Sequence, residues 1–164
     1  MEGTAGLQIA LSFYKPEFEE ELSSFLLPDD QAQFTGMPSD MLENSRKDQS
    51  KTPVVLTAGE MPVGFFLLES SARIFDYSSN PFSMLLAAFS VNYQHQGKGY
   101  AKKGLLLLPS FMAAHFPECT AIVLGVNKRN IRAYQLYLKA GFIDEGKIKM
   151  GPLGEQHILS LALT

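Results

Sequence analysis

The segment QHQGKGYAKKGLLLL, residues 94–108, follows the apolar run MLLAAFSV, residues 84–91, and this junction decides the fold. The apolar run has the composition of a strand that is buried on both faces. Gly97 and Gly99 then lead into a lysine-bearing helix. A strand that opens into a glycine loop and a helix N-terminus exposes backbone N–H groups, which favour anions. The junction therefore predicts a loop that holds a pyrophosphate.

Two common phosphate motifs fail at this loop. The dinucleotide fingerprint G-x-G-x-x-G requires a glycine at position 102, where the sequence has Lys102. Gly99 and Gly104 have the spacing of the Walker loop, but two leucines follow where that motif has lysine and then serine or threonine. The pattern that remains is Gln94-x-x-Gly97-x-Gly99. The lysines near this pattern add positive charge: Lys98, Lys102 and Lys103.

The composition predicts one globular domain over residues 1–164, because 46% of the residues are hydrophobic and 19% are charged. A net charge of −3 argues against a nucleic-acid partner. Cys119 is the only cysteine, which excludes an internal disulfide and a multi-cysteine metal site and indicates a cytoplasmic protein. The sequence has neither a signal-peptide pattern nor an apolar run of membrane-spanning length, so we expect no membrane partner. The three histidines lack metal-binding spacing, so we expect no metal.

The first third of the sequence predicts a strand and two helices. Residues 7–13 alternate as a strand does. Residues 38–48 suit a short helix that Ser39 would cap. Before it, residues 15–27 suit a helix that carries three apolar residues on one face: Phe18, Leu22 and Phe25.

The middle of the sequence predicts a hairpin, a central strand and a broken helix. Strands near residues 53–58 and 62–69 flank a tight turn. Residues 83–91 form the buried strand before the glycine loop. A helix over residues 98–115 must be kinked or divided at Pro109, because proline lacks the N–H that a helix interior requires.

The last third predicts a strand, a helix and two further strands. Residues 120–126 are apolar enough for a buried strand, and residues 142–151 and 155–163 read as a strand pair. The helix between the strand at residues 120–126 and this strand pair is expected to end at Gly141. We expect its apolar stripe to consist of Ile131, Tyr134 and Leu138. The order β-α-α-β-β-β-α-β-α-β-β indicates a mixed α/β sheet.

Two segments resemble the signatures of the GNAT N-acetyltransferase superfamily. The glycine loop resembles that family's pyrophosphate loop, Q/R-x-x-G-x-G/A. The second signature, V-N-x-x-N-x-x-A-x-x-L-Y-x-x-x-G-F, is similar to residues 126–142, where the matching positions are Val126, Asn127, Asn130, Ala133, Leu136, Tyr137, Gly141 and Phe142. The resemblance implies an α/β (α+β) fold with a central mixed, mostly antiparallel sheet of about seven strands and helices on both faces.

The resemblance also implies an N-acetyltransferase that uses acetyl-CoA, with no metal. In the family, the strand before the loop carries a bulge that frees backbone groups for the pantetheine and an amide for the thioester oxygen. The loop amides from about Gln96 to Tyr100 correspond to those that bind the pyrophosphate. The implied cofactor-binding residues are Phe89, Ser90, Val91, Gln94, Gln96, Gly97, Lys98, Gly99, Tyr100, Ala101, Asn127 and Asn130.

Tyr137 matches the family tyrosine that acts as general acid, since a phenol can protonate a leaving thiolate. The alternative is helix packing, with the hydroxyl bonded to backbone. Asn127 is expected to contact the ligand, whereas Asn130 is more simply a helix cap. Arg129 could reach a phosphate of the cofactor, although an exposed arginine is usually only solvated.

No general base stands out, because the strand MLLAAFSV has no carboxylate where some family members place a glutamate. The substitutes considered are Glu60, Glu69, Asp76, Tyr77 and His157. Cys119 could form an acyl-enzyme, but it reads more simply as a small core residue. Acidic residues of the first helices would steer a cationic amine or only form a solvated face: Glu19, Glu20, Glu21, Asp29 and Asp30.

Two functions therefore stand side by side. The first is an enzyme that acetylates a small-molecule amine, such as a polyamine, an amino acid or an aminoglycoside-like compound, or a peptide amine. The second is a module that binds acetyl-CoA without turnover, which the missing strand carboxylate keeps open. Dimers are common in the family, so a homodimer is a further expectation.

Overall fold

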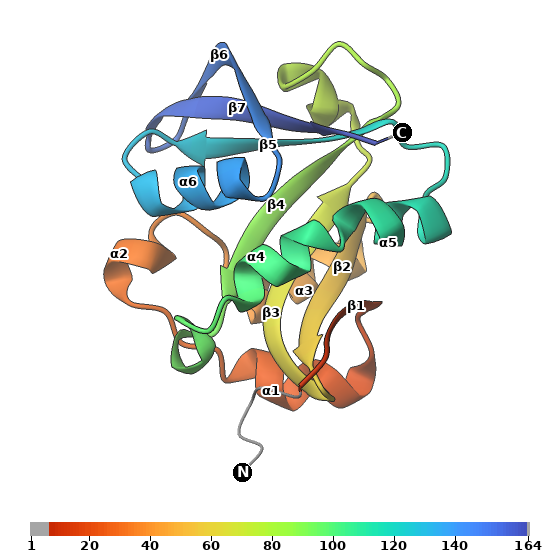
Figure 1. The fold of residues 1–164 in the computed structure, drawn as a ribbon, viewed down its shortest axis with the longest axis vertical. Helices are drawn as coiled ribbons and strands as arrows, with labels where there is room; N and C mark the ends of the chain where they lie inside the picture. Colours follow the sequence, from red (N-terminus) through yellow and green to blue (C-terminus); the bar gives the residue numbers. More distant parts are fainter. Residues whose placement is uncertain (1–6, 164) are drawn as a thin grey trace.

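The computed structural model describes residues 7–163 and contains a seven-stranded sheet in the order β1-β2-β3-β4-β5-β7-β6 (Figure 1). The strands are β1 (Ile9–Phe13), β2 (Lys51–Ala58), β3 (Met61–Glu69), β4 (Ser83–Val91), β5 (Ala121–Asn127), β6 (Ile143–Gly151) and β7 (Gly154–Ala162). Among the neighbouring pairs of this sheet, β4 and β5 are parallel and the others are antiparallel. The expected mixed, mostly antiparallel sheet is confirmed, with β4 at its centre.

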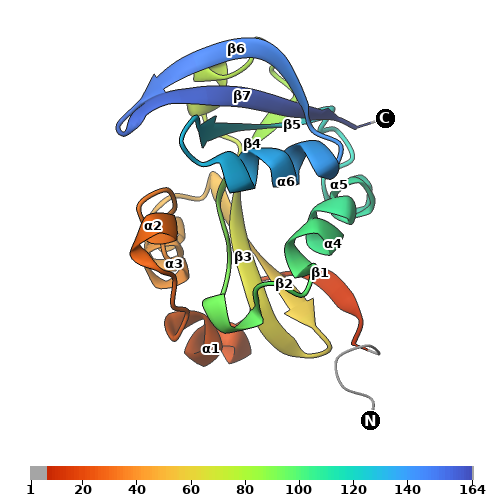
Figure 2. The same cartoon turned by 60° about the vertical axis from the view of Figure 1, so that its left-hand side comes forward.

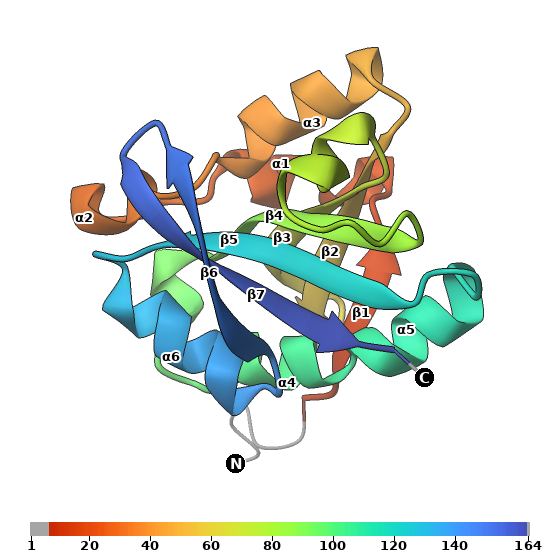
Figure 3. The same ribbon diagram turned by 90° about the horizontal axis from the view of Figure 1, so that it is seen from above.

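Helices cover both faces of the sheet, as expected (Figure 3). The α-helices are α1 (Glu19–Ser23), α2 (Asp29–Ala32), α3 (Pro38–Lys47), α4 (Tyr100–Leu106), α5 (Leu108–His115) and α6 (Ile131–Lys139), and the 3-10 turns are Pro16–Phe18, Ala72–Asp76 and Tyr93–His95. In Figure 3, α1 and α3 lie on one side of the sheet and α4, α5 and α6 on the other. Within residues 7–163, none of these helices has the length and apolarity needed to cross a membrane.

The two faces of β2 and β3 divide the core into separate layers, because successive strand residues point to opposite faces. The layer under α1 and α3 contains the apolar face expected from the sequence and joins it to alternate strand residues: Phe18, Leu22, Phe25, Leu42, Val55, Phe65 and Leu67. The layer under α4 and α5 takes the intervening residues: Val54, Phe66, Leu68, Leu105, Leu108, Phe111 and Met112.

The expected break at Pro109 is confirmed, whereas two other features of the helices differ from the expectations. Pro109 divides the expected long helix, since α4 ends at Leu106 and α5 begins at Leu108. Proline there occupies the first turn of the new helix, where its missing N–H costs nothing. Ser39 does not cap α3: the cap residue is Met37, and Pro38 begins the helix. The short helix α2 was not expected, because four residues are too few to show a periodic pattern.

The buried face of α6 also differs from the expected stripe. Ile131 is 62% exposed and Leu138 is 38% exposed, while Tyr134 is half-buried. The face that packs on the core is shifted around the helix: it keeps Tyr134 from the expected stripe and otherwise consists of Ala133, Leu136, Tyr137 and Ala140. Both sets have helical spacing, and the packing of Tyr137 against Phe89 and Phe142 distinguishes the second.

Two neighbouring leucines test the packing of the α4–α5 junction. Leu108 is 0% exposed and Leu106 is 52% exposed. We expect Leu108→Ala to lower the free energy of unfolding by about 2–5 kcal/mol, because it leaves a cavity in the core. Leu106→Ala is the matched control and should change it by less than about 0.5 kcal/mol. Urea unfolding measures both, and equal losses would contradict this account of the core.

Candidate active site

The sheet opens between β4 and β5. These strands pair only between residues 83–85 and 121–123, so beyond Leu85 the edge of β4 that faces β5 has no strand partner. On the β3 side, Ala88 and Phe89 together stand across from one residue, Phe66, which makes a β-bulge. Ala88 has φ = 58°, a left-handed conformation that bends the strand. In Figure 2, β5, β6 and β7 lie in the upper half and β1, β2 and β3 in the lower half, and β4 is labelled beside β5, with which its first residues pair.

A cavity of about 790 Å³ lies at this opening. Its walls come from β4, the glycine loop, β5, α6, the segment between α1 and α3, and the β6–β7 turn. Two of the residues expected to bind the cofactor, Gln94 and Lys98, are exposed and do not line the cavity. The other expected residues all line it: Phe89, Ser90, Val91, Gln96, Gly97, Gly99, Tyr100, Ala101, Asn127, Asn130 and Tyr137.

The glycine loop presents a run of unpaired backbone donors. Gly97 and Gly99 both have φ = 80°, which favours glycine. The N–H of Gln96 donates to the Tyr93 carbonyl, so the expected run of donors begins one residue later. Within the described chain, the N–H groups of residues 97–102 have no hydrogen-bond acceptor, and the N–H of Lys103 is the first to bond back into the helix, to the Gly99 carbonyl. These donors fit the needs of a diphosphate.

The charged residues of the cavity wall are cationic. Lys102 of α4 and Arg132 and Lys139 of α6 line it. Over residues 7–163, no aspartate or glutamate belongs to the lining. Of the three lysines noted near the loop, only Lys102 lines the cavity. Lys98 and Lys103 are exposed and do not belong to the lining. The wall therefore attracts anions, in agreement with the loop amides.

Tyr137 lines the same cavity and is 8% exposed. Its ring centroid lies 6.3 Å from that of Phe89 on the bulge and 5.5 Å from that of Phe142, both in edge-on contacts. Its hydroxyl makes no hydrogen bond to any other residue that the structure describes, in contrast to the backbone bond that a packing role predicts. Burial raises the pKa of Tyr137 well above its usual range. The phenol is therefore a protonated donor at neutral pH.

Asn127 and Asn130 both have partners inside the chain. The Asn127 amide donates to the Leu153 carbonyl at 3.1 Å and accepts from the Arg129 N–H at 2.8 Å. This side chain therefore fastens the end of β5 to the β6–β7 turn. Asn130 Oδ1 accepts from the Ala133 N–H at 3.4 Å and caps α6, as expected.

Arg129 does not itself line the cavity, but it contacts two residues that do. Its Nη2 donates to the Leu153 carbonyl at 3.1 Å. Its Cζ lies 5.5 Å from the centroid of the Phe34 ring. Leu153 and Phe34 both line the cavity. The guanidinium is thus held by two wall residues, rather than moving freely in solvent.

Sequence reasoning missed the contacts that hold the glycine loop. Gln96 and Gln31 of α2 exchange hydrogen bonds of 3.2 and 2.8 Å, and Gln96 also donates to the Val91 carbonyl. Asn92 is buried and accepts from the Leu26 N–H at 3.0 Å. These partners lie more than sixty residues apart, so no local pattern could have revealed them.

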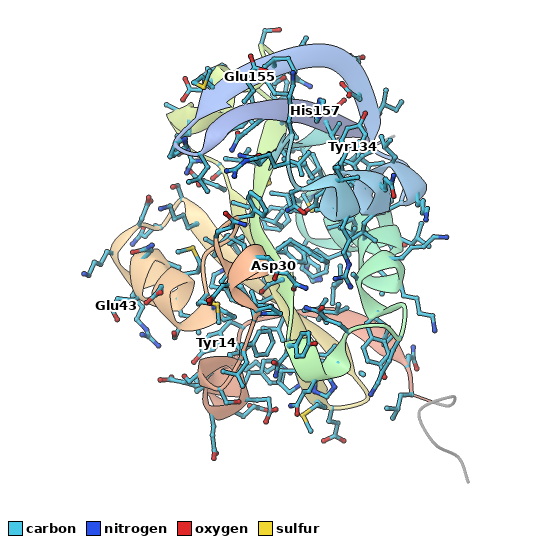
Figure 4. All side chains as sticks on the ribbon, turned by 90° about the vertical axis from the view of Figure 1, so that its left-hand side faces the viewer. Tyr14, Asp30, Glu43, Tyr134, Glu155 and His157 are labelled. Carbon is cyan, nitrogen blue, oxygen red and sulfur yellow. The ribbon has the colours of Figure 1, made fainter. Side chains whose placement is uncertain are left out.

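None of the groups considered as general base or nucleophile lines the cavity; these were Glu60, Glu69, Asp76, Tyr77, His157 and Cys119. Glu69 is buried in an ion pair of 3.3 Å with Arg73. His157 lies 4.5 Å from the ring of Tyr134, and the Tyr134 hydroxyl donates to Asp144 at 2.7 Å. Figure 4 shows Tyr134 and His157 close to each other beside the β6–β7 hairpin. Cys119 is a partly buried core residue, as its simpler reading predicted.

The family model described as acetyltransferase (GNAT) family matches residues 11–142. The chain belongs to this family. A Bacillus subtilis relative, described as the uncharacterized N-acetyltransferase YbbJ, is 50% identical over 152 residues, which are 92% of this chain and 95% of the relative. The GNAT resemblance of the two signatures is thereby confirmed.

Solved structures share the GNAT fold at low sequence identity. An aminoglycoside acetyltransferase AAC(6')-Ib in complex with coenzyme A has a TM-score of 0.76 at 19% identity, over 94% of this chain and 95% of that one. A chimera of the spermidine N-acetyltransferase SpeG from Vibrio cholerae has a TM-score of 0.67 at 18% identity, over 94% and 95% of the two chains. These likenesses establish the fold.

GNAT membership confirms the expected acetyltransferase and its donor, acetyl-CoA. The cationic wall and the unpaired loop amides fit such a donor. In the part of the chain that the structure describes, no group of three or more His, Cys, Asp or Glu residues is placed to hold a metal ion.

Three glycines allow a matched test of the loop. Gly97, Gly99 and the distant Gly146 of β6 all have positive φ, and a Cβ at each would meet no atom within 4 Å. We expect Gly99→Val or Gly97→Val to weaken acetyl-CoA binding at least about tenfold, because valine resists this backbone conformation and displaces the donors. Gly146→Val imposes similar strain away from the cavity and should leave the affinity unchanged. Titration calorimetry measures the affinities, and wild-type binding by both loop variants would refute the role of the loop.

Proposed function

We propose that this protein transfers an acetyl group from acetyl-CoA directly to a primary amine of a small molecule, such as a polyamine or an amino acid, or of a peptide. The observation that carries the proposal is that one cavity is lined both by Gly97 and residues 99–102, whose amides are unpaired, and by Tyr137, whose hydroxyl is unpaired. The amides suit the diphosphate of the donor. A proton donor in the same cavity is needed for acetyl transfer, whereas binding of the donor alone does not require one.

The donor would lie along the open edge of β4. The loop amides from Gly97 onward hold the diphosphate, near the cations Lys102, Arg132 and Lys139. Residues 86–91 line the cavity beyond the point where β4 leaves β5, so their unpaired backbone groups on that edge serve the pantetheine amides and the thioester oxygen. Holding the thioester along a rigid strand removes much of the orientational freedom that an encounter in water would have.

The transfer requires two proton movements. The amine nitrogen attacks the thioester carbon, the C–N bond forms, and the C–S bond breaks. Tyr137 donates a hydrogen bond to the sulfur as negative charge develops there, and its proton passes to the thiolate. Because no carboxylate lines the described cavity, we assign the proton of the amine to water. Water then restores the phenol.

This assignment fixes the pH dependence. Without a base on the chain, kcat/KM should rise about tenfold per pH unit up to the pKa of the acceptor amine, because only the neutral amine attacks. Since burial raises the pKa of Tyr137, the acid form is retained at least up to the usual tyrosine value of about 10. Profiles recorded with amines of different pKa should shift with the amine. A limb between pH 5 and 8 that stays fixed for all amines would instead assign a base to the protein, and His95, which lines the cavity, would be its candidate.

Tyr137→Phe tests the acid directly. We expect kcat to fall by about 10²–10⁴-fold with little change in acetyl-CoA affinity, because the hydroxyl serves only the leaving group. Tyr134→Phe is the matched control on the same helix, since its hydroxyl binds Asp144 outside the cavity. Steady-state kinetics and calorimetry measure the two quantities. Wild-type kcat in Tyr137→Phe would remove the assignment.

A module that binds acetyl-CoA without turnover remains the second candidate, because the cavity has no carboxylate to accept the amine proton. Thiol release from acetyl-CoA, measured across a panel of amines, separates the two. An enzyme releases thiol in proportion to acceptor, whereas a binding module shows only stabilisation by the ligand.

A further inference from the structure

The acceptor side of the cavity is uncharged. The segment between α1 and α3 and the β6–β7 hairpin contribute apolar, amide and hydroxyl side chains, among them Gln31, Phe34, Thr35, Leu153 and Gln156. As noted above, the described lining contains no carboxylate, and its cations are on α4 and α6. A polycation that enters such a site loses its hydration without gaining counter-charges, which is costly.

The acidic residues of the N-terminal segment lie elsewhere. Glu20 and Glu21 of α1, together with Glu17 and Glu60, line a separate hollow near the β2–β3 turn. Asp30 is exposed on α2 and does not line the cavity (Figure 4). None of these carboxylates belongs to the cavity lining, so none forms part of the wall against which an acceptor amine would lie.

Unsatisfied polar atoms gather at the cavity. Across residues 7–163, five buried side-chain polar atoms have no hydrogen-bond partner, and four of these belong to cavity-lining residues: Thr35 Oγ1, Ser90 Oγ, His95 Nε2 and Gln156 Oε1. Buried polar atoms without a partner are rare and costly, so a concentration of them indicates groups that a ligand or water satisfies. Their neutral character suits a small polar ligand.

One cation lies beside the acceptor wall, although it does not itself line the cavity. Arg129 is held against Phe34 and the Leu153 carbonyl, and only one of its guanidinium donors is used in these contacts. None of the ion pairs within the described residues involves Arg129. Its neighbour Lys128 differs, because Lys128 pairs with Glu155 at 2.8 Å. Arg129 is thus a positioned guanidinium with unused donors, in contact with two residues of the cavity wall.

From these observations, and resting on the proposed acetyl transfer, we propose that the acceptor is a small amine that also carries an anionic group, a carboxylate or a phosphate, and that Arg129 binds that group. The planar guanidinium matches either anion with two parallel hydrogen bonds. The amine end then lies in the neutral part of the cavity, towards the bulge of β4. The acceptor class is an amino acid or an amino phosphate, and polyamines and aminoglycosides are disfavoured.

Paired acceptors test the proposal. Thiol release is measured for amines with and without the anionic group: phenylalanine against phenethylamine, 4-aminobutyrate against butylamine, and phosphoethanolamine against ethanolamine, with spermidine and kanamycin as polycations. We expect the anionic member of at least one pair to exceed its partner and both polycations by about 10- to 100-fold in kcat/KM, the effect of one hydrogen bond to a charged group. The first two pairs and the third distinguish carboxylate from phosphate. A preference for the bare amines or the polycations would overturn the proposal.

Variants locate the effect at Arg129. Arg129→Ala should remove the advantage of the anionic acceptor over its bare-amine partner, with acetyl-CoA affinity unchanged. Arg129→Lys should restore only part of it, because lysine lacks the planar fork. Lys128→Ala is the matched control and should behave as wild type, since its partner lies outside the cavity. An unchanged preference in Arg129→Ala would refute the role of Arg129.

Binding separates this proposal from the proposed activity. Calorimetry with the protein–CoA complex measures acceptor affinity without turnover. Binding of the anionic amines that depends on Arg129, with no thiol release from any amine, would overturn the acetyl transfer but retain the ligand class. Thiol release with polycations and with no other amine would support the acetyl transfer but overturn the ligand class. If no anionic amine binds and none is acetylated, the proposed ligand class is wrong.

Discussion

The loss of pairing between β4 and β5 after Leu85 is the constraint on which the site depends. Backbone groups that are buried without partners cost about 1–3 kcal/mol each, so a central strand rarely gives up one of its neighbours. Here β4 keeps its pairing with β3 and absorbs one extra residue in the bulge at Ala88 and Phe89. The released edge is tolerated because it faces a cavity that water or a ligand can enter. The opening is therefore a consequence of how the strands pair, and it does not require a conformational change.

Polar contacts of side chains hold together the segments that form each wall of this opening. Asn127 and Arg129 hold the end of β5 to the β6–β7 turn through the Leu153 carbonyl. Gln96 holds the glycine loop to α2 through Gln31. The loop that suits the diphosphate and the segment that forms the acceptor wall are thus joined directly. A change of position in either one is transmitted to the other.

The strands could be predicted from the sequence because their signals are local. The central strand was predicted to the residue, since its continuous apolar run ends at polar residues on both sides. Pro109 predicted the division between α4 and α5 for an equally local reason. The face of α6 could not be predicted, because two stripes have helical spacing and only the packing of Tyr137 against Phe89 and Phe142 distinguishes them. The Ser39 cap failed because the proline before it begins the helix.

The site was predictable to the extent that it is made of backbone. Glycine spacing identified the loop, and the conformation at Gly97 and Gly99 agrees with it. Side-chain roles were harder, because an asparagine that contacts a ligand and one that fastens two turns look alike in a sequence. Asn127 is such a case: its amide has two partners inside the chain, and residue 153 supplies one of them.

Overall charge could not have described the cavity. The chain carries a net charge of −3, yet the described lining residues include lysine and arginine and no carboxylate. The acidic residues of the N-terminal segment instead line a second hollow or lie on exposed helix faces, where water screens them. A site that is cationic where the diphosphate would lie and neutral where an amine would enter divides one cavity by charge. That division of charge depends on which helices face the opening, so it follows from the fold. It could not be predicted from the motifs or from the composition.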